Sequence, residues 1–409
     1  MKTDYDLLII GGGMVGASLA CALAPLSLKI GLVERFPFKE TGQPAYDDRS
    51  IALAWGSMRI FHDMGLSEAL MEVVSPIKRI HISERGQFGA TRLDSMQMDV
   101  DALGYVVESR ELGKILHTRL QQASNIEMIC PADVQEIRMT EKQALLSIAQ
   151  DGQITQVSAS LVVAADGSQS SVRELLEIPS TTWDYGQTAL ISNVSTRKHH
   201  QQVAYERFTD TGPLALLPMK DLQEGEQTLS RCSLVWTLRN DQVDEYMALS
   251  DAEFLQRLQA RFGHRLGEFI RVGRRHSFPL KLVRATEYVQ ARVALIGNAA
   301  HTIHPVAGQG YNLGIRDVAA LAEVLATAVQ AGQDIGDIEV MKHYVEWRKQ
   351  DHRRVIAFTD GLARIFSNPL FPVKKLRSAA LTLLDVIPPF KNALARRTMG
   401  LSGRRANLP

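Results

Sequence analysis

The opening of the chain constrains the fold more than any other stretch. An apolar run, Tyr5 to Ile10, leads into Gly11-Gly12-Gly13-Met14-Val15-Gly16 and then into a helical run that ends near Leu23. A second apolar run, Lys29 to Val33, ends at Glu34, 23 residues after Gly11. A strand, a G-x-G-x-x-G turn, a helix and a strand ending in an acid form a dinucleotide-binding βαβ unit. The chain therefore predicts an α/β fold with a Rossmann-like domain.

Two other interpretations of this opening exist. Residues 7–28 carry no formal charge, and such a stretch is long enough to cross a bilayer or to serve as a signal segment. Three glycines and Pro25 interrupt it, however, and Asp4 and Asp6 precede it, as a strand–turn–helix unit explains better. The second alternative is a packing turn followed by an ordinary surface Glu34.

A second glycine-rich turn lies late in the chain. Residues 293–296 form a short apolar run typical of a buried parallel strand, and residues 314–330 favour a long helix. Between them, Gly308 and Gly310 leave backbone N–H groups unobstructed, and the helix presents its positive end there. We therefore expect an anionic group, or a group that becomes anionic, at Gln309-Gly310. The alternative is a helix start whose glycines only permit tight packing.

Two motifs in the chain resemble those of a known family. Residues 304–317 read His-Pro-Val-Ala-Gly-Gln-Gly-Tyr-Asn-Leu-Gly-Ile-Arg-Asp. This segment resembles the signature of the ubiquinone-biosynthesis aromatic hydroxylases, a branch of the FAD-dependent single-component aromatic monooxygenases. Asp166-Gly167, followed by Ser170 and Arg173, resembles the DG motif of the same monooxygenases, although Asp-Gly after a strand is also a common turn.

One position departs from the wider family. Gly297-Asn298 stands where most members have Gly-Asp, whose side chain holds the ribityl chain of FAD. An amide still accepts a hydrogen bond from a ribityl hydroxyl, but it carries no charge. Among the ubiquinone hydroxylases, the Gly-Asn-Ala-Ala form is most similar to enzymes acting on 2-polyprenyl-6-methoxyphenol.

The resemblance implies a cofactor set and a reaction. It implies tightly bound FAD, NAD(P)H as a transient reductant and O2, with hydroxylation through a flavin C4a-hydroperoxide. The implied activity is C1 hydroxylation of 2-polyprenyl-6-methoxyphenol in ubiquinone biosynthesis. Alternatives are a sister hydroxylase acting on another ring carbon and a non-catalytic flavoprotein scaffold of the biosynthetic complex. A flavin halogenase is disfavoured because W-x-W-x-I-P is absent from the sequence.

The fingerprint and the resemblance together assign a set of residues to the cofactor. These are Gly11, Gly13, Met14, Val15, Gly16, Glu34, Arg35, Arg49, Arg110, Asp166, Gly167, Gly297, Asn298, Gly308, Gln309, Gly310 and Asn312. Gln309 and Gly310 are expected to stabilise negative charge on the flavin ring. For Arg49 the alternative is a surface ion pair with Asp47 or Asp48, and for Arg110 a helix-start pair with Glu111.

The region from Trp183 to about Leu282 changes to strand-like runs and predicts a mostly antiparallel sheet. In the family such a sheet forms the far wall of the substrate cavity. Leu216, Pro218 and Trp236, together with Pro305, are the candidate substrate residues, although the first three are more readily interpreted as core. The sequence singles out no catalytic base: His301 and His304 flank the late turn, where a histidine bonded to backbone is more common.

The expected organisation follows from these elements. It comprises an FAD-binding domain (residues 1–180 and 283–330), a substrate-binding sheet domain (181–282) and a C-terminal helical region (331–409). The region from Asp360 to Pro409 carries nine Lys or Arg against two Asp or Glu. Such a tail suits contact with an anionic bilayer or a partner protein, or packing on the body with a solvated basic face.

The amino-acid composition restricts which other partners we expect. Lys plus Arg (46) nearly balances Asp plus Glu (45), which argues against a nucleic-acid partner. Three widely spaced cysteines, Cys21, Cys130 and Cys232, predict buried thiols in a reducing compartment and no metal site. We therefore expect a cytoplasmic protein, peripheral on the inner face of the membrane if the tail binds lipid, and working with other ubiquinone-biosynthesis proteins.

Overall fold

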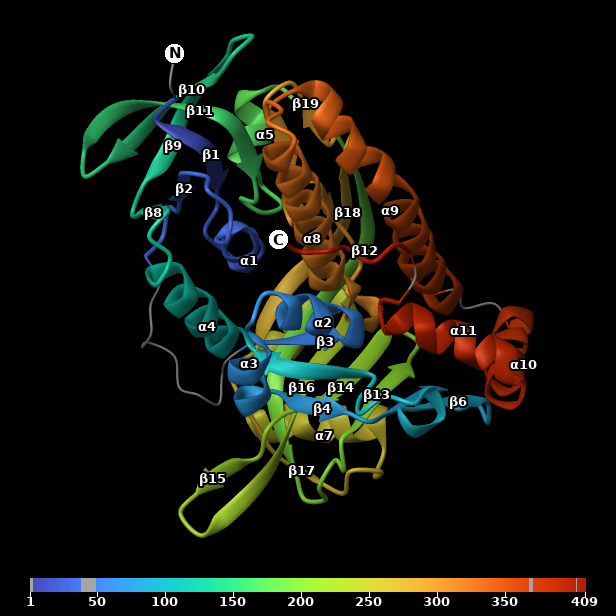
Figure 1. The fold of residues 1–409 in the computed structure, drawn as a ribbon. Coiled ribbons are helices and arrows are strands. Elements are labelled where there is room, and N and C mark those ends of the chain that lie inside the picture. The colour runs from blue at the N-terminus through green and yellow to red at the C-terminus, as the bar shows by residue number, and fades with distance from the viewer. Residues whose placement is uncertain (1–2, 38–48, 368–370, 402) are drawn as a thin grey trace.

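The computed structural model describes residues 3–37, 49–367, 371–401 and 403–409 and has an upper α/β part and a lower sheet part (Figure 1). The upper sheet has the strand order β19-β20-β11-β1-β2-β8, extended beyond β11 by β10 and β9. Its strands are β1 (Tyr5–Ile10), β2 (Ile30–Val33), β8 (Ile126–Ile129), β9 (Asp133–Met139), β10 (Ala144–Gln150), β11 (Gln153–Ala164), β19 (Val289–Gln290) and β20 (Val293–Leu295).

The centre of this sheet is parallel. β1 runs parallel to both β2 and β11, β2 to β8, and β11 to β20, so the carboxyl ends of these strands share one edge. The helices associated with this part are α1 (Met14–Leu23), α4 (Ser109–Gln121), α5 (Ser171–Leu175), α8 (Gln309–Gln330) and α9 (Ile338–Ser367). Residues 7–28 thus form a strand, a turn and a short helix, and no helix in the described ranges is long and apolar enough to cross a bilayer.

The lower sheet is larger than the sequence predicts. Its order is β21-β18-β12-β16-β14-β13-β5-β6, with β15 paired to β16 and β17 to β12. Its strands are β5 (Arg79–Glu84), β6 (Ala90–Asp94), β12 (Ser180–Thr196), β13 (Val203–Phe208), β14 (Pro213–Pro218), β15 (Leu222–Glu224), β16 (Gln227–Arg239), β17 (Phe269–Val272), β18 (His276–Ala285) and β21 (His301–Thr302).

The domain boundary at residue 180 needs a correction. The hairpin β5–β6, which the sequence analysis assigned to the FAD-binding domain, joins the lower sheet because β5 runs parallel to β13. Parallel strands are not joined by a tight turn, so the sequence around β5 carries no local pattern that would predict its pairing with β13. The other described pairs of this sheet are antiparallel, as predicted.

A small sheet lies between the two large ones. It has the order β3-β7-β4 and consists of β3 (Ser50–Ala54), β4 (Ser75–Ile77) and β7 (Gly104–Glu108). Helices α2 (Trp55–Asp63) and α3 (Ser67–Val73) accompany it, and Figure 1 shows this layer in front of β13, β14 and β16.

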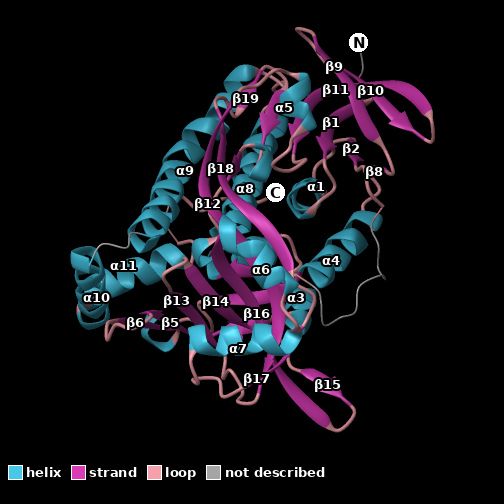
Figure 2. Ribbon diagram, turned by 180° about the vertical axis from the view of Figure 1, so that it is seen from behind, coloured by secondary structure: helices cyan, strands magenta, loops and turns pink. Residues whose placement is uncertain are grey.

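The opposite face of the lower sheet carries an aromatic core. Helix α7 (Asp251–Phe262) packs there through Phe254, Leu258 and Phe262 (Figure 2), preceded by α6 (Val243–Ala248). Trp236 is fully buried in this core, with its ring centroid 5.0 Å from that of Tyr246.

The C-terminal helices α10 (Phe371–Val386) and α11 (Pro388–Thr398) pack on the body beside β6 (Figure 1). Thr91 Oγ1 donates to the Leu381 carbonyl at 2.7 Å, and the Gly56 N–H donates to the Met399 carbonyl at 2.8 Å. Arg377 forms a buried ion pair with Glu84. The tail therefore covers the outer edge of the lower sheet.

Replacing Trp236 by Ala should cost about 3–5 kcal/mol of unfolding free energy, because it empties a closed aromatic site. Trp236→Phe should cost clearly less, since the indole Nε1 has no hydrogen-bond partner in the described part of the chain. Equilibrium denaturation of both variants measures this difference, and an equal loss in the two would contradict the packing described.

Candidate functional site

The two glycine-rich turns predicted to bind one cofactor lie side by side. A Cβ added at Gly297 would lie 3.0 Å from Val15 Cγ1, and one added at Gly314 would lie 3.2 Å from Val15 Cγ2. Ser18 Oγ and the Tyr311 hydroxyl are 3.3 Å apart, which joins α1 to α8 one turn further on. Helix α1, which begins at the first turn, therefore packs on Gly297 and on the N-terminal part of α8, the helix that begins at the late turn.

The other predicted motifs lie along the same edge of the upper sheet. Gly11 follows β1, Glu34 follows β2, Asp166 follows β11 and Gly297 follows β20, all after the carboxyl ends of parallel strands. Ligands of open α/β sheets bind beyond these ends.

Glu34 has a defined place in this edge. Its Oε2 accepts from the Gly12 N–H at 2.7 Å and its Oε1 from the Phe36 N–H at 2.8 Å. A carboxylate has about four acceptor positions, so capacity for ribose hydroxyls remains.

The start of α1 fits a pyrophosphate. Its N-cap, Gly13, provides no side-chain cap, and the first turn contains no acid, so the helix's positive end is uncompensated by the protein. Gly13 is exposed, and a Cβ added there would meet nothing within 4 Å. Gly16 differs, because its added Cβ would lie 1.9 Å from the Gly11 carbonyl oxygen. Gly16 is thus required by packing, whereas Gly13 faces open space.

The DG motif connects the two halves of the site. Asp166 Oδ2 accepts from the Val172 N–H at 3.1 Å and so holds the start of α5, while its Oδ1 is buried without a partner in the described part of the chain. Arg173 donates to the carbonyls of Ser168 and Ala299, each at 2.7 Å. This guanidinium ties the turn containing Gly167 to the turn that follows Gly297.

The late turn is shaped by backbone geometry. The short 3-10 helix η5 (Val306–Gly308) ends at Gly308, whose φ of +61° suits glycine, and a Cβ there would lie 3.0 Å from Ala52 Cβ. Helix α8 begins at Gln309 without a side-chain cap, and a Cβ at Gly310 would meet nothing within 4 Å. No acidic residue occupies the first turn of α8, so the positive end of its dipole is not compensated there. The role of Gln309 and Gly310 at the flavin ring stays a prediction.

Asn312 has a structural role that the sequence analysis missed. Its amide oxygen accepts from the Ala54 N–H and from Ser57 Oγ, each at 2.7 Å. Its amide nitrogen donates to the Ala52 carbonyl at 2.8 Å and to the Gly308 carbonyl at 2.6 Å. With four hydrogen bonds made, the side-chain amide of Asn312 is fully used in holding β3 against the late turn, and a cofactor contact of this residue stays a prediction.

The predicted arginines are dispersed. Arg35 is exposed and pairs with Asp133 at 2.7 Å. Arg49 is exposed, with its Cζ 5.7 Å from the centroid of the Phe278 ring, and the alternative partners Asp47 and Asp48 lie outside the described residues.

Arg110, by contrast, forms the helix-start pair with Glu111, at 3.4 Å. Asn298, also assigned to the cofactor, lies in the short 3-10 helix η4 (Gly297–Ala299) and is exposed.

Three of the four predicted substrate residues lie on one face of the lower sheet, and the fourth lies in the late turn. Leu216 and Trp236 are fully buried in the core under α7, so their alternative interpretation as core holds. Pro218, two residues beyond Leu216 on β14, is buried on the same side. Pro305 is partly exposed and lies in the late turn, immediately before η5.

His304 is buried under the late turn. Its ring meets that of Tyr185 edge-on at 5.1 Å, and its Nδ1 accepts from the Val306 N–H at 3.3 Å. Burial lowers the pKa of His304 to about 4, so the side chain is neutral at physiological pH.

A buried charged cluster supports the late turn from behind. Asp317 Oδ1 accepts from Arg348 Nε at 2.7 Å and His352 Nε2 at 2.6 Å, and its Oδ2 accepts from His301 Nε2 at 2.8 Å and the Gly297 N–H at 3.3 Å. Burial alone would raise the pKa of Asp317, but His352, Arg348 and His301 hold it well below its ordinary value.

A second acid completes the charge balance of this cluster. Asp351 pairs with Arg348 at 2.7 Å and with Arg316 at 2.9 Å. Two carboxylates therefore face two guanidiniums in this cluster.

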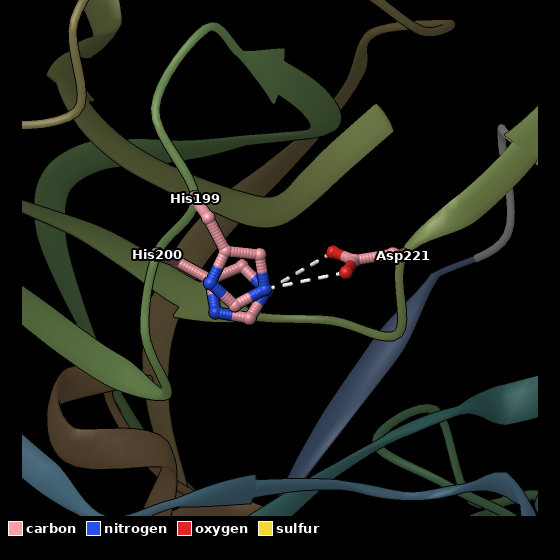
Figure 3. Close-up of side chains that lie close together, drawn as sticks. All are labelled: His199, His200 and Asp221. Atoms are coloured by element: carbon pink, nitrogen blue, oxygen red, sulfur yellow. Dashed lines mark ion pairs between the residues drawn. The ribbon is translucent and has the colours of Figure 1, made fainter. Parts of the chain in front are cut away.

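Two groups of side chains have the spacing of metal ligands. In the first, His199, His200 and Asp221 face one another (Figure 3), with His199 exposed and His200 buried. The Nδ1 atoms of both histidines accept backbone N–H groups of Gln201 and Gln202, at 2.9 and 3.1 Å. The remaining ring nitrogens also have partners: His200 Nε2 lies 3.0 Å from the Met219 carbonyl oxygen, and His199 Nε2 lies 3.2 Å from Asp221 Oδ2. Hydrogen bonding explains this group, as it does the second one, His301, Asp317 and His352.

Comparison with known proteins agrees with this geometry. The sequence matches the FAD binding domain family over residues 4–359. It is 37% identical over 396 residues to ubiquinone hydroxylase UbiL of Rhodospirillum rubrum, covering 97% of this chain and 89% of the relative. It is 29% identical to the 3-demethoxyubiquinol 3-hydroxylase of Escherichia coli, covering 97% and 98%. The p-nitrophenol 4-monooxygenase PnpA of Pseudomonas putida shares the fold, with a TM-score of 0.80 at 19% identity over 99% and 100% of the two chains.

The chain thus belongs to the FAD binding domain family of flavoproteins. Within it, the chain is an FAD-dependent aromatic hydroxylase, with NAD(P)H and O2 as co-substrates, as the sequence predicts.

The stability of the protein should fall as the pH is lowered from 6.5 toward 4. Burial lowers the pKa of His352 from 6.5 to about 4, so the unfolded chain binds a proton there before the folded protein does. Within this window the loss is about 1.4 kcal/mol per pH unit for one such histidine. Melting temperatures across the window measure it, and His352→Gln, which retains a donor for Asp317 but does not titrate, should reduce the slope. An unchanged slope in this variant would contradict the assignment.

Proposed function

We propose that this protein hydroxylates the ring of a polyprenylated phenol in ubiquinone biosynthesis, at C1 of 2-polyprenyl-6-methoxyphenol. The observation that carries the proposal is the contact of Val15 with Gly297 and Gly314, because it brings together the two helices that begin at the turns proposed to bind FAD. The names of the relatives from Rhodospirillum rubrum and Escherichia coli support the pathway. The Gly297-Asn298-Ala-Ala sequence supports the substrate.

Different residues of the site suit different parts of FAD. Glu34 and the turn of Gly11 to Gly16 suit the adenosine and pyrophosphate, and the N–H groups at Gln309-Gly310 suit the pyrimidine end of the flavin. When bound, FAD supplies the redox chemistry that uses NAD(P)H and O2 to hydroxylate an aromatic ring. The uncompensated N-terminus of α8 favours negative charge at that end, which stabilises the reduced cofactor.

A sister hydroxylase acting on another ring carbon is the second candidate. The Escherichia coli relative, named for hydroxylation at position 3, supports it. The intermediate that accumulates when the gene is deleted separates the two: loss of C1 hydroxylation leaves 2-polyprenyl-6-methoxyphenol, whereas a later block leaves a partly substituted quinone.

The purified protein should be yellow, and a polyprenylated phenol should increase its rate of NAD(P)H oxidation. Gly13→Trp should abolish FAD binding and turnover with little loss of stability, because the side chain enters open space where the pyrophosphate is expected. Gly361→Ala in α9, where an added Cβ also meets nothing within 4 Å, is the matched control and should behave as the wild type. A colourless wild-type protein, or a yellow Gly13→Trp variant, would refute the proposed site.

The C-terminal helices supply a candidate membrane contact, the proposed route to a lipid-soluble substrate. Leu383, Val386 and Phe390 are 56%, 70% and 61% exposed around the α10–α11 corner, in a tail rich in Lys and Arg. The wild type should therefore sediment with anionic phospholipid vesicles, whereas the double variant Val386→Ser/Phe390→Ser should stay in the supernatant. Ile154→Ser, at a 68% exposed residue of β11, is the control and should still bind. Equal binding of all three proteins would show that the corner plays no part in membrane contact.

A further inference from the structure

The lower sheet contains one row of side chains that differs from its surroundings. Ile191, Val235, Ala215, Glu206 and Ile82 are direct neighbours in register across β12, β16, β14, β13 and β5. All five are partly exposed. We call these five residues the accessible row.

The flanking residues show that this accessibility is local. In β16, Val235 is the one partly exposed residue between Ser230 and Leu238, and in β12, Ile191 is the one partly exposed residue between Gln187 and Thr196. Solvent therefore reaches the middle of two strands that are otherwise buried there. Such a row indicates a space against the sheet that the protein does not fill.

The accessible row faces away from the aromatic core. Side chains alternate along a strand, and Leu190, Leu216 and Trp236, which are adjacent to row residues in their strands, pack under α7. The row is thus on the face turned toward the small β3-β7-β4 sheet, as Figure 1 shows for β13, β14 and β16.

Two apolar clusters border the row on that face. Ala204 and Leu217 pack with Ile77 of β4 and Val106 of β7. At the other border, Phe208 and Ile82 pack with Leu362 of α9 and with Leu381 of α10.

Helix α9 relates the row to the late turn. Two residues before Leu362, Asp360 accepts a hydrogen bond at 3.2 Å from the hydroxyl of Tyr185, and the Tyr185 ring meets that of His304. The row and the segment leading into Gly308–Gly310 are thus bordered by the same turns of α9.

Glu206 is the single charged residue of the accessible row. In the described part of the chain no group donates a hydrogen bond to its carboxylate or forms an ion pair with it. Burial raises the pKa of Glu206 to about 7. A carboxylate held among apolar side chains without a donor from the protein is costly, and a donor on a bound ligand would relieve that cost.

We propose that Glu206 is a catalytic residue that binds the hydroxyl of the phenol substrate and accepts its proton. This inference rests on the proposed function. In the step, the phenol O–H bond breaks and a Glu206 Oε–H bond forms, while the electron pair stays on the phenol oxygen and enriches the ring carbons that are hydroxylated. The proton returns to the oxygen of the product, so Glu206 undergoes no net change. The apolar members of the row contact the substituted ring.

Glu206→Gln tests this role, because the amide has the same size but accepts no proton. The variant should hold FAD and melt like the wild type, yet hydroxylate the phenol about 10²–10⁴-fold more slowly. NAD(P)H oxidation should continue with H2O2 as the product in place of the hydroxylated ring. In the wild type kcat/KM should fall as the pH drops below about 7, and this acidic limb should vanish in the variant.

Glu226→Gln is the matched control, since it makes the same change at an exposed turn of the same sheet. It should retain both the rate and the acidic limb. Full activity and an unchanged pH profile in Glu206→Gln would overturn the role of Glu206 while the proposed function stands. Absence of phenol hydroxylation by the wild type and by Glu226→Gln would instead overturn the proposed function itself.

Discussion

The buried carboxylate of Asp317 is the interaction on which the site depends. It receives hydrogen bonds from a backbone N–H of the cofactor edge, from two histidines and from Arg348 of α9. Such a group is expensive to bury, and it persists because donors surround it and Asp351 and Arg316 balance the charges. One side chain thereby fixes the relation of the turn at Gly297 to helices α8 and α9.

Next to the buried Asp317 cluster, the cofactor-binding edge is formed mainly by backbone groups. Gly297 and Gly314 allow Val15 to approach closely, and Gly308 allows β3 to approach the late turn. Arg173 and Asn312 then connect these turns through carbonyl groups of distant segments. A surface built in this way presents N–H groups without side chains in front of them, which suits a cofactor that must be gripped along its length.

The two faces of the lower sheet have different roles: one is closed core, and the other is open to a ligand. The face under α7 is closed by aromatic packing around Trp236, whereas the opposite face retains the accessible row with Glu206 among apolar residues. Because neighbouring side chains of a strand point to opposite faces, a single strand such as β16 contributes Trp236 to the core and Val235 to the row. An apolar surface with one proton acceptor suits a substituted phenol.

The sequence by itself determined the local elements that a short pattern encodes. The βαβ opening, the strand before Asp166 and the late turn all depend on residues close together in the chain, so periodicity and glycine positions were sufficient. Only the tertiary structure decided which faces and partners these elements have. The parallel pairing of β5 with β13, the use of Asn312 to hold β3, the core position of Leu216 and the exposure of Glu206 all arise between segments far apart in sequence. Alternation along a strand predicts that two faces exist, but the elements packed against them decide which face is closed and which remains open to a ligand.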